Sequence, residues 1–313
     1  MAVYPVAAGM SDIGSTTMGY TPTIYSGKLV KKLYANTVFG AVANTDYEGE
    51  IKSFGESVKI RSLPNISIRR YAKGQNLVPE QPKSTALTLN IDKGYYWAFI
   101  DEDVERAQTD LKNYVDLWTD VAARQLQIAI DADVLQNVYA DASSYNQGLT
   151  AGLISGDIDL GVDAGVSVEL TVDNVINKIV QCGQVLDEQN VPPEGRWMIV
   201  PAWVHTLLLT SDLKAAFLTG DATSPMRHGR VGMIDTFTIY RSNQLGTSSD
   251  TVGDTTTHIM FGTNHAITFA TQLVKNEQAA NPFGFGNIHK GLQVYGYKVV
   301  LPEALGWLYA KKG

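Results

Sequence analysis

Apolar residues recur at helical spacing through one long stretch of the chain. Residues 95–147 contain no glycine or proline, and apolar side chains follow one another there at steps of three or four: Leu111, Val115, Trp118, Ala122, Leu126, Ile130 and Val134. That period is typical of the buried face of an α-helix. The pattern predicts one helix from Asp110 to Ala140, roughly 45 Å long at about 1.5 Å per residue. We expect the aromatic run before it to enter this helix as core: Tyr95, Tyr96, Trp97 and Phe99.

Residues 50–93 follow a different period. Val58 and Ile60 alternate with polar residues, and so do the apolar positions at 87, 89 and 91, which predicts two β-strands. The residues between these strands include several that interrupt a continuous ladder: Pro64, Gly74, Pro79 and Pro82. We therefore expect a long irregular hairpin.

The first residues of the chain have the composition of an extended arm. Residues 1–22 mix Gly, Ser, Thr and Pro with isolated apolar positions, so they cannot close a core of their own. From Thr23 to Val38 the apolar positions return to helical spacing, which predicts a short amphipathic helix.

The second half of the chain mixes helices and strands. A loop or small hairpin is expected at 143–170, followed by a helix that Thr171 caps and that runs to Leu186. A second helix is expected from Pro201, with a break near Ser211. Strands are expected at 197–200, 237–240, 258–261, 266–269 and 294–301. Because this order has no regular βαβ alternation, the predicted class is α+β.

The formal net charge of −7 is unevenly distributed. Residues 52–83 carry seven lysines and arginines against two glutamates, a surplus of +5, which leaves −12 elsewhere. An acidic chain of this kind is unlike a dedicated nucleic-acid binder, which carries a basic surplus. Four acids crowd the start of the long helix, where the helix dipole favours them: Asp101, Glu102, Asp103 and Glu105. We hypothesise that they pair with cations from the hairpin of a neighbouring copy: Arg61, Arg69, Arg70 and Lys73.

The sequence contains no familiar catalytic pattern. There is no GxSxG, HExxH, phosphate loop or paired CxxC, and GFG at 284–286 lacks the third glycine of a dinucleotide fingerprint. The histidines lack metal-ligand spacing and are expected at the surface or hydrogen-bonded in the core: His205, His228, His258, His265 and His289. Cys182, the single cysteine, falls in an apolar helical pattern and is expected to be buried. We therefore expect that the protein is not an enzyme and that it has no cofactor and no metal site.

Two charged clusters allow a second interpretation. The carboxylates at 101–105 are of the type used in general acid–base catalysis, although an acidic cap is favoured at a helix start. The Arg69–Arg70–Tyr71 cluster has side chains that grip phosphate, although one basic segment in an acidic chain favours a protein contact. No secretory signal and no apolar run of roughly 18 residues is present, so we expect a protein made in a cytoplasm without a membrane partner.

The order of arm, basic hairpin, very long helix and mixed α/β region resembles the major capsid proteins of tailed phages with the Hong Kong 97 fold. Several stretches are similar to the podovirus-type coat proteins of that family: GESVKI at 55–60, NVPPEGRWMIVP at 190–201, GMIDTFTIYRSN at 232–243 and YGYKVVLPE at 295–303. The resemblance covers nearly the whole chain, and each stretch alone is moderately specific.

The resemblance implies a division of the chain into five parts. These are an N-terminal arm at 1–40, an E-loop with flanking strands at 41–98, a peripheral domain with the spine helix at 99–170, an axial domain at 171–262, and late strands shared between both domains at 263–313. It also implies a non-enzymatic subunit that builds an icosahedral shell of pentamers and hexamers in the host bacterial cytoplasm.

The resemblance further implies several partners. They are other copies of the chain, a scaffolding protein, a portal protein, a decoration or cement protein and non-specifically packaged double-stranded DNA. Lys73 and Lys83 lie in the hairpin, but no motif for a Lys–Asn cross-link between subunits can be matched. Three alternatives remain open at this stage: an encapsulin-like cargo compartment, an α/β enzyme with an unfamiliar site, and an independent nucleic-acid-binding module.

Overall fold

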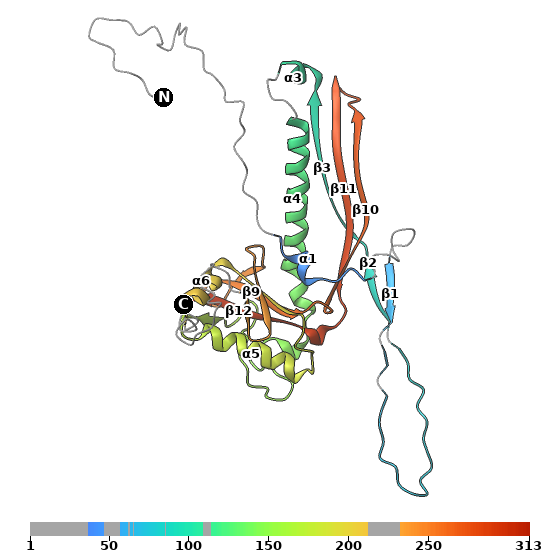
Figure 1. Ribbon diagram of the computed structural model, residues 1–313, viewed down its shortest axis with the longest axis vertical. Coiled ribbons are helices and arrows are strands. Elements are labelled where there is room, and N and C mark those ends of the chain that lie inside the picture. Colours follow the sequence, from blue (N-terminus) through green and yellow to red (C-terminus); the bar gives the residue numbers. More distant parts are fainter. Residues whose placement is uncertain are drawn as a thin grey trace, which may run out of the picture.

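A computed structural model describes residues 37–46, 57–61, 63–64, 66–84, 86–108, 114–211 and 232–313. These residues form a long, narrow rod of sheet and helix joined to a compact α/β body, with a hairpin on the opposite side of the rod from the body (Figure 1). None of the helices in these ranges has both the length and the apolar character needed to cross a membrane.

The rod is a three-stranded antiparallel sheet with one long helix along it. The strands β3 (Lys93–Glu102), β10 (Ile267–Ala280) and β11 (Gly286–Val299) are arranged in the order β10-β11-β3. Helix α4 (Tyr114–Asn137) runs beside β3, and the short helix α3 (Asp103–Gln108) lies at the far end (Figure 1). Phe99 packs edge-on against Trp118 with ring centroids 5.7 Å apart, so aromatic side chains join the sheet to the helix.

The hairpin consists of β1 (Ser57–Arg61) and β2 (Ala86–Asn90), paired antiparallel with Ile60 opposite Leu87. The described residues between the two strands form neither helix nor strand. A small core of Ile60, Leu89, Ile91 and Ala270 packs the hairpin onto the base of β10. The hairpin is therefore fixed at its base, while its far end extends away from the rod (Figure 1).

The body is a mixed sheet in the order β4-β12-β9-β5-β7-β6, with β8 paired to β9. Its strands are β4 (Val168–Leu170), β5 (Arg196–Val200), β6 (Met233–Ile234), β7 (Phe237–Arg241), β8 (Thr247–Ser249), β9 (Thr255–Thr263) and β12 (Leu305–Lys312). The β4–β12 and β5–β7 pairs are parallel. Helices α5 (Val175–Glu188) and α6 (Ala202–Thr210) contribute their apolar faces to the core of this body.

Short elements join the rod to the body. Helix α1 (Phe39–Val42) and the 3-10 turn η1 (Val138–Asp141) contribute Phe39, Val42 and Val138 to a core shared with Trp197 of β5. The other 3-10 turns are η2 (Ser144–Asn146) and η5 (Pro302–Ala304). Because one apolar core includes α4, β5, β9 and β12, the rod and the body are packed together rather than merely linked.

Most of the predicted elements are confirmed. The two hairpin strands, the long helix through residues 114–137, the helix after Pro201 and the later strands are present. The loop or small hairpin at 143–170 contains a β-bridge between Ala151 and Ile158. The arm at 1–22, most of the helix expected at 23–38 and residues 110–113 of the long helix lie outside the described residues.

Two local predictions are wrong. The run from Tyr95 to Phe99 lies in strand β3, not at a helix start, and Tyr96 is 78% exposed instead of buried. Pairing with β11, nearly two hundred residues away, decides this, and it turns alternate side chains to opposite faces of the sheet. Thr171 does not cap α5: the cap position is Asn174, whose side-chain oxygen accepts the Thr171 N–H at 2.8 Å.

Candidate assembly surfaces

The hairpin ends in a segment, residues 63–84, that we call the tip segment. It carries six large apolar side chains that the described chain leaves uncovered: Leu63, Ile66, Ile68, Tyr71, Leu77 and Val78. Leu63 and Ile68 are 95% and 94% exposed. Contiguous exposed apolar surface is typical of a contact with another protein.

A few local contacts fold the tip segment back on itself. Glu80 accepts hydrogen bonds from the Ser67 N–H at 3.2 Å and from Arg69 Nη2 at 2.7 Å. The bond from the Ser67 N–H, followed by that from Arg69, lowers the pKa of Glu80. A turn at 73–74 reverses the chain, and Gly74 supplies the positive φ of +85° that it needs. Arg69 is therefore already engaged, whereas Arg70 and Lys73 have no ion pair among the described residues.

The predicted acids lie at the far end of the rod, but they are not equivalent. Asp101 is buried and accepts hydrogen bonds from Arg106 Nε at 2.9 Å, from Arg106 Nη2 and from the Tyr114 hydroxyl. Burial raises the pKa of Asp101, but the bonds from Tyr114 and Arg106 outweigh it, so the pKa lies below its usual range. This carboxylate ties β3 to α3 and α4, and its burial keeps it out of reach of a neighbouring copy.

The remaining three acids, Glu102, Asp103 and Glu105, are exposed, and we call them the acidic end. Asp103 lies 3.7 Å from Arg106, a contact too long to be a strong ion pair. Beside them, the turn between β10 and β11 presents Phe283 and Phe285, which are 97% and 88% exposed. Gly286 pairs with Glu102 across the sheet, so the acids and the two aromatic rings share one end of the rod.

The structure separates the predicted cations from the predicted acids. The tip segment and α3 lie at opposite ends of the molecule (Figure 1). Arg61 is exposed at the end of β1, next to the tip segment. Among the described residues no ion pair joins any of the four cations to any of the four acids within one chain. Their pairing between copies stays a hypothesis.

Asp131 of α4 is a buried carboxylate that the sequence analysis missed. Its Oδ1 accepts the N–H groups of Val38 and Phe39 at 3.1 and 2.8 Å, so it anchors the start of α1 to the long helix. Burial raises the pKa of Asp131, and these two N–H groups oppose that rise. The signal that could have identified it is an acid beside Ile130 and three residues before Val134, on the apolar face of the predicted helix.

A second carboxylate on α4 fixes the helix to the sheet. Asp133 accepts hydrogen bonds from Lys93 Nζ at 3.0 Å and from the Tyr295 hydroxyl at 2.8 Å. The Lys93 ammonium also lies 4.3 Å from the centre of the Tyr297 ring. Burial and the bond to Asp133 both raise the pKa of Tyr295, so this hydroxyl stays protonated and keeps donating.

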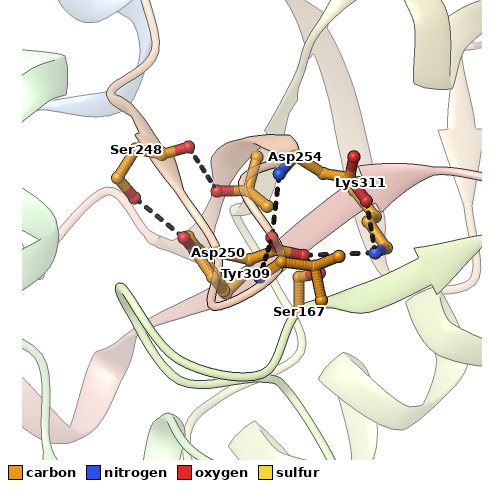
Figure 2. Close-up of polar contacts among 8 residues, drawn as sticks. Ser167, Ser248, Asp250, Asp254, Tyr309 and Lys311 are labelled. Carbon is orange, nitrogen blue, oxygen red and sulfur yellow. Dashed lines mark hydrogen bonds and ion pairs between the residues drawn. The ribbon is translucent and has the colours of Figure 1, made fainter.

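A polar cluster fixes the edge of the body sheet (Figure 2). Asp250 accepts hydrogen bonds from Ser167 at 2.8 Å, from Lys311 at 3.1 Å and from the N–H groups of Val252 and Asp254 at 2.9 Å. Burial raises the pKa of Asp250, but the bond from Ser167 and the others outweigh it and hold the pKa below its usual range. All its oxygens are used within the chain, so this acid is structural.

The most deeply buried histidine and the single cysteine both lie in the core of the body. His258 is buried, with Nδ1 3.1 Å from the Gly246 carbonyl oxygen and Nε2 3.0 Å from Asp163, as expected for a hydrogen-bonded core residue. Cys182 is fully buried, as predicted, and burial raises the pKa of its thiol to about 12. Within the described ranges no three His, Cys, Asp or Glu side chains are grouped to hold a metal ion.

Comparison with known proteins shows which family has this sequence pattern and this fold. The sequence profile of the phage capsid protein family matches residues 85–308. The structure is similar to that of Mycobacterium phage Che8, with a TM-score of 0.72 and 24% identity, covering 92% of this chain and 96% of that one. It is also similar to the capsid structure of cyanophage P-SCSP1u, with a TM-score of 0.73, 14% identity and 100% of both chains covered. No curated protein sequence matches the chain.

A third similar structure is the mature capsid of bacteriophage PhiM1, with a TM-score of 0.69, 14% identity and 99% of both chains covered. These likenesses confirm the predicted α+β, Hong Kong 97-like fold. The profile match extends over most of the chain and establishes the family. The chain belongs to the phage capsid protein family, as a structural subunit of the viral shell.

Proposed function

We propose that this protein is the subunit of an icosahedral shell, built of pentamers and hexamers, that encloses a double-stranded DNA genome. The observation that carries the proposal is the tip segment, because the hairpin extends away from the rod and the body and the large apolar side chains of its tip are exposed. Ordering a segment costs roughly 1–2 kcal/mol per residue, which a single subunit cannot offset without covering that surface. Contacts with a neighbouring copy would bury this apolar surface.

The tip segment would act as the E-loop of the capsid family, and the rod and the body as the peripheral and axial domains. The proposed division is 1–40, 41–98, 99–170, 171–262 and 263–313. Strands β10 and β11 belong to the rod and β12 to the body, which supports a last part shared between the two. Burying the apolar tip against a neighbour contributes about 25 cal/mol per Å² of covered apolar area.

Charge would set the register between copies. The tip segment keeps Arg70 and Lys73 unpaired among the described residues, and the acidic end keeps Glu102 and Glu105 exposed. We propose that these groups meet across the contact between two copies, with Arg61 as a further cation. Each exposed pair contributes only about 0–1 kcal/mol, so the pairs select the partner and its position more than they hold it.

Other partners follow from this proposal. A scaffolding protein, a portal protein and a decoration or cement protein would join the shell, and assembly would take place in the cytoplasm of the host bacterium. The net charge of −7 supports a DNA-facing wall without tight phosphate binding, because a basic lining would hold the packaged DNA in place.

The experiment is assembly of the purified chain, observed by negative-stain electron microscopy. The wild type is expected to form closed shells, and the double variant Arg70→Glu, Lys73→Glu to remain a folded subunit by circular dichroism without closing shells. Lys312→Glu, an exposed charge reversal on the body, is the matched control and should assemble normally. Normal shells from the double variant would refute the charge pairing.

Failure of the wild-type chain to form any particle, with or without a co-expressed scaffolding protein, would refute the shell function itself. Co-purification then separates a phage shell from the encapsulin-like alternative. Particles that contain nuclease-protected DNA or portal protein support the proposal. Particles that contain a packaged cargo enzyme instead indicate a compartment shell.

A further inference from the structure

A cavity of about 450 Å³ lies between α1, α4 and the β10–β11 pair. Its rim includes the exposed residues Thr37, Gly40, Thr45 and Gln127, so it opens to the surface. Its walls are largely apolar side chains: Phe39, Ala43, Ile130 and Phe269. The cavity therefore admits a side chain with an apolar stem.

Asp131 lines this cavity and is 2% exposed. Its Oδ1 is occupied by the N–H groups of Val38 and Phe39, but no donor among the described residues reaches its buried Oδ2. The other described residues that line the cavity carry no charge. A buried carboxylate oxygen without a donor is costly. Oδ2 has almost no accessible surface, so a cation in the cavity reaches it only after the side chains at the cavity wall shift, and the bond it then receives removes that cost.

The distance between this cavity and the acidic end is fixed by the rod. Lys93, which contacts Asp133 near the cavity, and Glu102 at the acidic end are nine residues apart on β3. At about 3.3 Å per residue in a strand, that separation is roughly 30 Å. Because α4 and the sheet are packed along this whole length, the two acidic sites keep their spacing.

The tip segment carries two cations at a matching spacing. Lys73 lies at its turn, and Lys83 lies ten residues later, near its base, in a stretch without helix or strand. The turn ends at Gly74, and from there to Lys83 an extended chain advances about 3.3 Å per residue, which places the backbones of the two lysines roughly 30 Å apart. Both lysines are exposed, and neither has an ion pair among the described residues.

We propose that the Lys83 ammonium of a second copy enters the Asp131 cavity and donates to Oδ2, while its Lys73 lies at the acidic end. The four methylene groups of the lysine contact the apolar walls, and the charged head meets the carboxylate. This inference rests on the proposed function and deepens it, because it names a second receiving site and the direction of the tip segment along the neighbouring rod.

Disulfide trapping tests the contact with Asp131 left intact. Gln127→Cys on the cavity rim is combined with Lys83→Cys, and in a second protein Glu105→Cys is combined with Lys73→Cys. Cys182 is fully buried and stays silent. After mild oxidation of assembled shells, non-reducing gels are expected to show ladders of linked subunits for both pairs. Gln127→Cys with Lys59→Cys, an exposed lysine on β1, is the control pair and should stay monomeric.

The outcomes distinguish failure of the Lys83–Asp131 contact from failure of the proposed shell function. Intact shells with a ladder for the 73–105 pair but none for the 83–127 pair overturn this inference and leave the proposed function standing. A faster-migrating monomer for the 83–127 pair also overturns it, because the contact then lies within one chain. Absence of shells from the wild type refutes the proposed function instead.

Charge removal gives an independent measurement. Lys83→Met and Asp131→Asn are each expected to raise the protein concentration needed for assembly about tenfold, and the double variant to raise it no further. Lys59→Met should leave it unchanged. If the effects of the two single variants multiply in the double variant, the two groups do not contact each other and the inference fails.

Discussion

Arg196 provides the sharpest test of how the body is held together. Its guanidinium is fully buried, and it donates to Asp187 at 2.6 Å and to the carbonyl oxygens of Val191 and Pro192 at 2.5 and 3.0 Å. These contacts hold the loop after α5 against the start of β5. Arg196→Met keeps most of the side-chain volume and removes every one of these donors, so it isolates the polar contribution.

The expected loss depends on how far each acceptor is shielded from water. The Asp187 side chain is 64% exposed and can return to water, so its loss of a partner costs little. Val191 is half-buried and Pro192 is exposed, and the carbonyl group of each loses a hydrogen bond from a charged donor. Such a bond contributes about 1.5–3 kcal/mol, and less where water can replace the donor. We therefore expect Arg196→Met to reduce the free energy of unfolding by about 2–5 kcal/mol.

Urea unfolding of the unassembled subunit measures this loss. Trp197 is buried next to Arg196, so tryptophan fluorescence reports on the same part of the body. Arg196→Lys should lose part of the stability, because an ammonium retains the charge but cannot reach all the acceptors that a guanidinium reaches. Arg241→Met, an exposed arginine on β7, is the control and should stay within about 0.5 kcal/mol of wild type. A loss below about 1 kcal/mol for Arg196→Met would refute the reasoning.

Three further predictions concern the hairpin, the rod and the response to acid. Leu89→Ala in the core at the hairpin base should cost about 2–5 kcal/mol in urea unfolding, because Leu89 is fully buried. Asp133→Asn should weaken the attachment of α4 to the sheet, since Lys93 and Tyr295 lose an anionic acceptor, and amide hydrogen exchange in α4 should accelerate. Burial raises the pKa of Glu188, but the N–H groups of residues 155 and 154 outweigh it and lower the pKa from 4.5 to about 2, so stability present above about pH 4.5 should fall as the pH approaches 2.

Each of these has its own control. Leu117→Ala, on the exposed side of α4, should cost much less than Leu89→Ala, and equal losses would contradict the core assignment. Asp116→Asn on the same helix should leave hydrogen exchange unchanged, and the Asp133 prediction fails if the two variants behave alike. Glu188→Gln should flatten the change in urea midpoint between pH 5 and about pH 2, and an unchanged pH profile would exclude Glu188 as its source.

The sequence by itself determined the elements whose signal is local. The period of apolar residues located the long helix because each turn of an α-helix repeats the same contact within a few residues. Alternation at 58–60 and 87–91 located the hairpin strands for the same reason, and the prolines and Gly74 between them excluded a continuous ladder. The apolar helical pattern around Cys182 likewise predicted a buried side chain, as the structure confirms.

The tertiary structure alone decided which side chains meet. Tyr95 to Phe99 became a strand because β11 pairs with it from far along the chain, and no local pattern encodes that partner. The four predicted acids appeared alike in the sequence, yet only Asp101 is enclosed by Arg106 and Tyr114. Asp131 gained its role when α1 and the β10–β11 pair closed a cavity around it. Burial and pairing depend on residues distant in the chain, so they emerge only when the chain is folded.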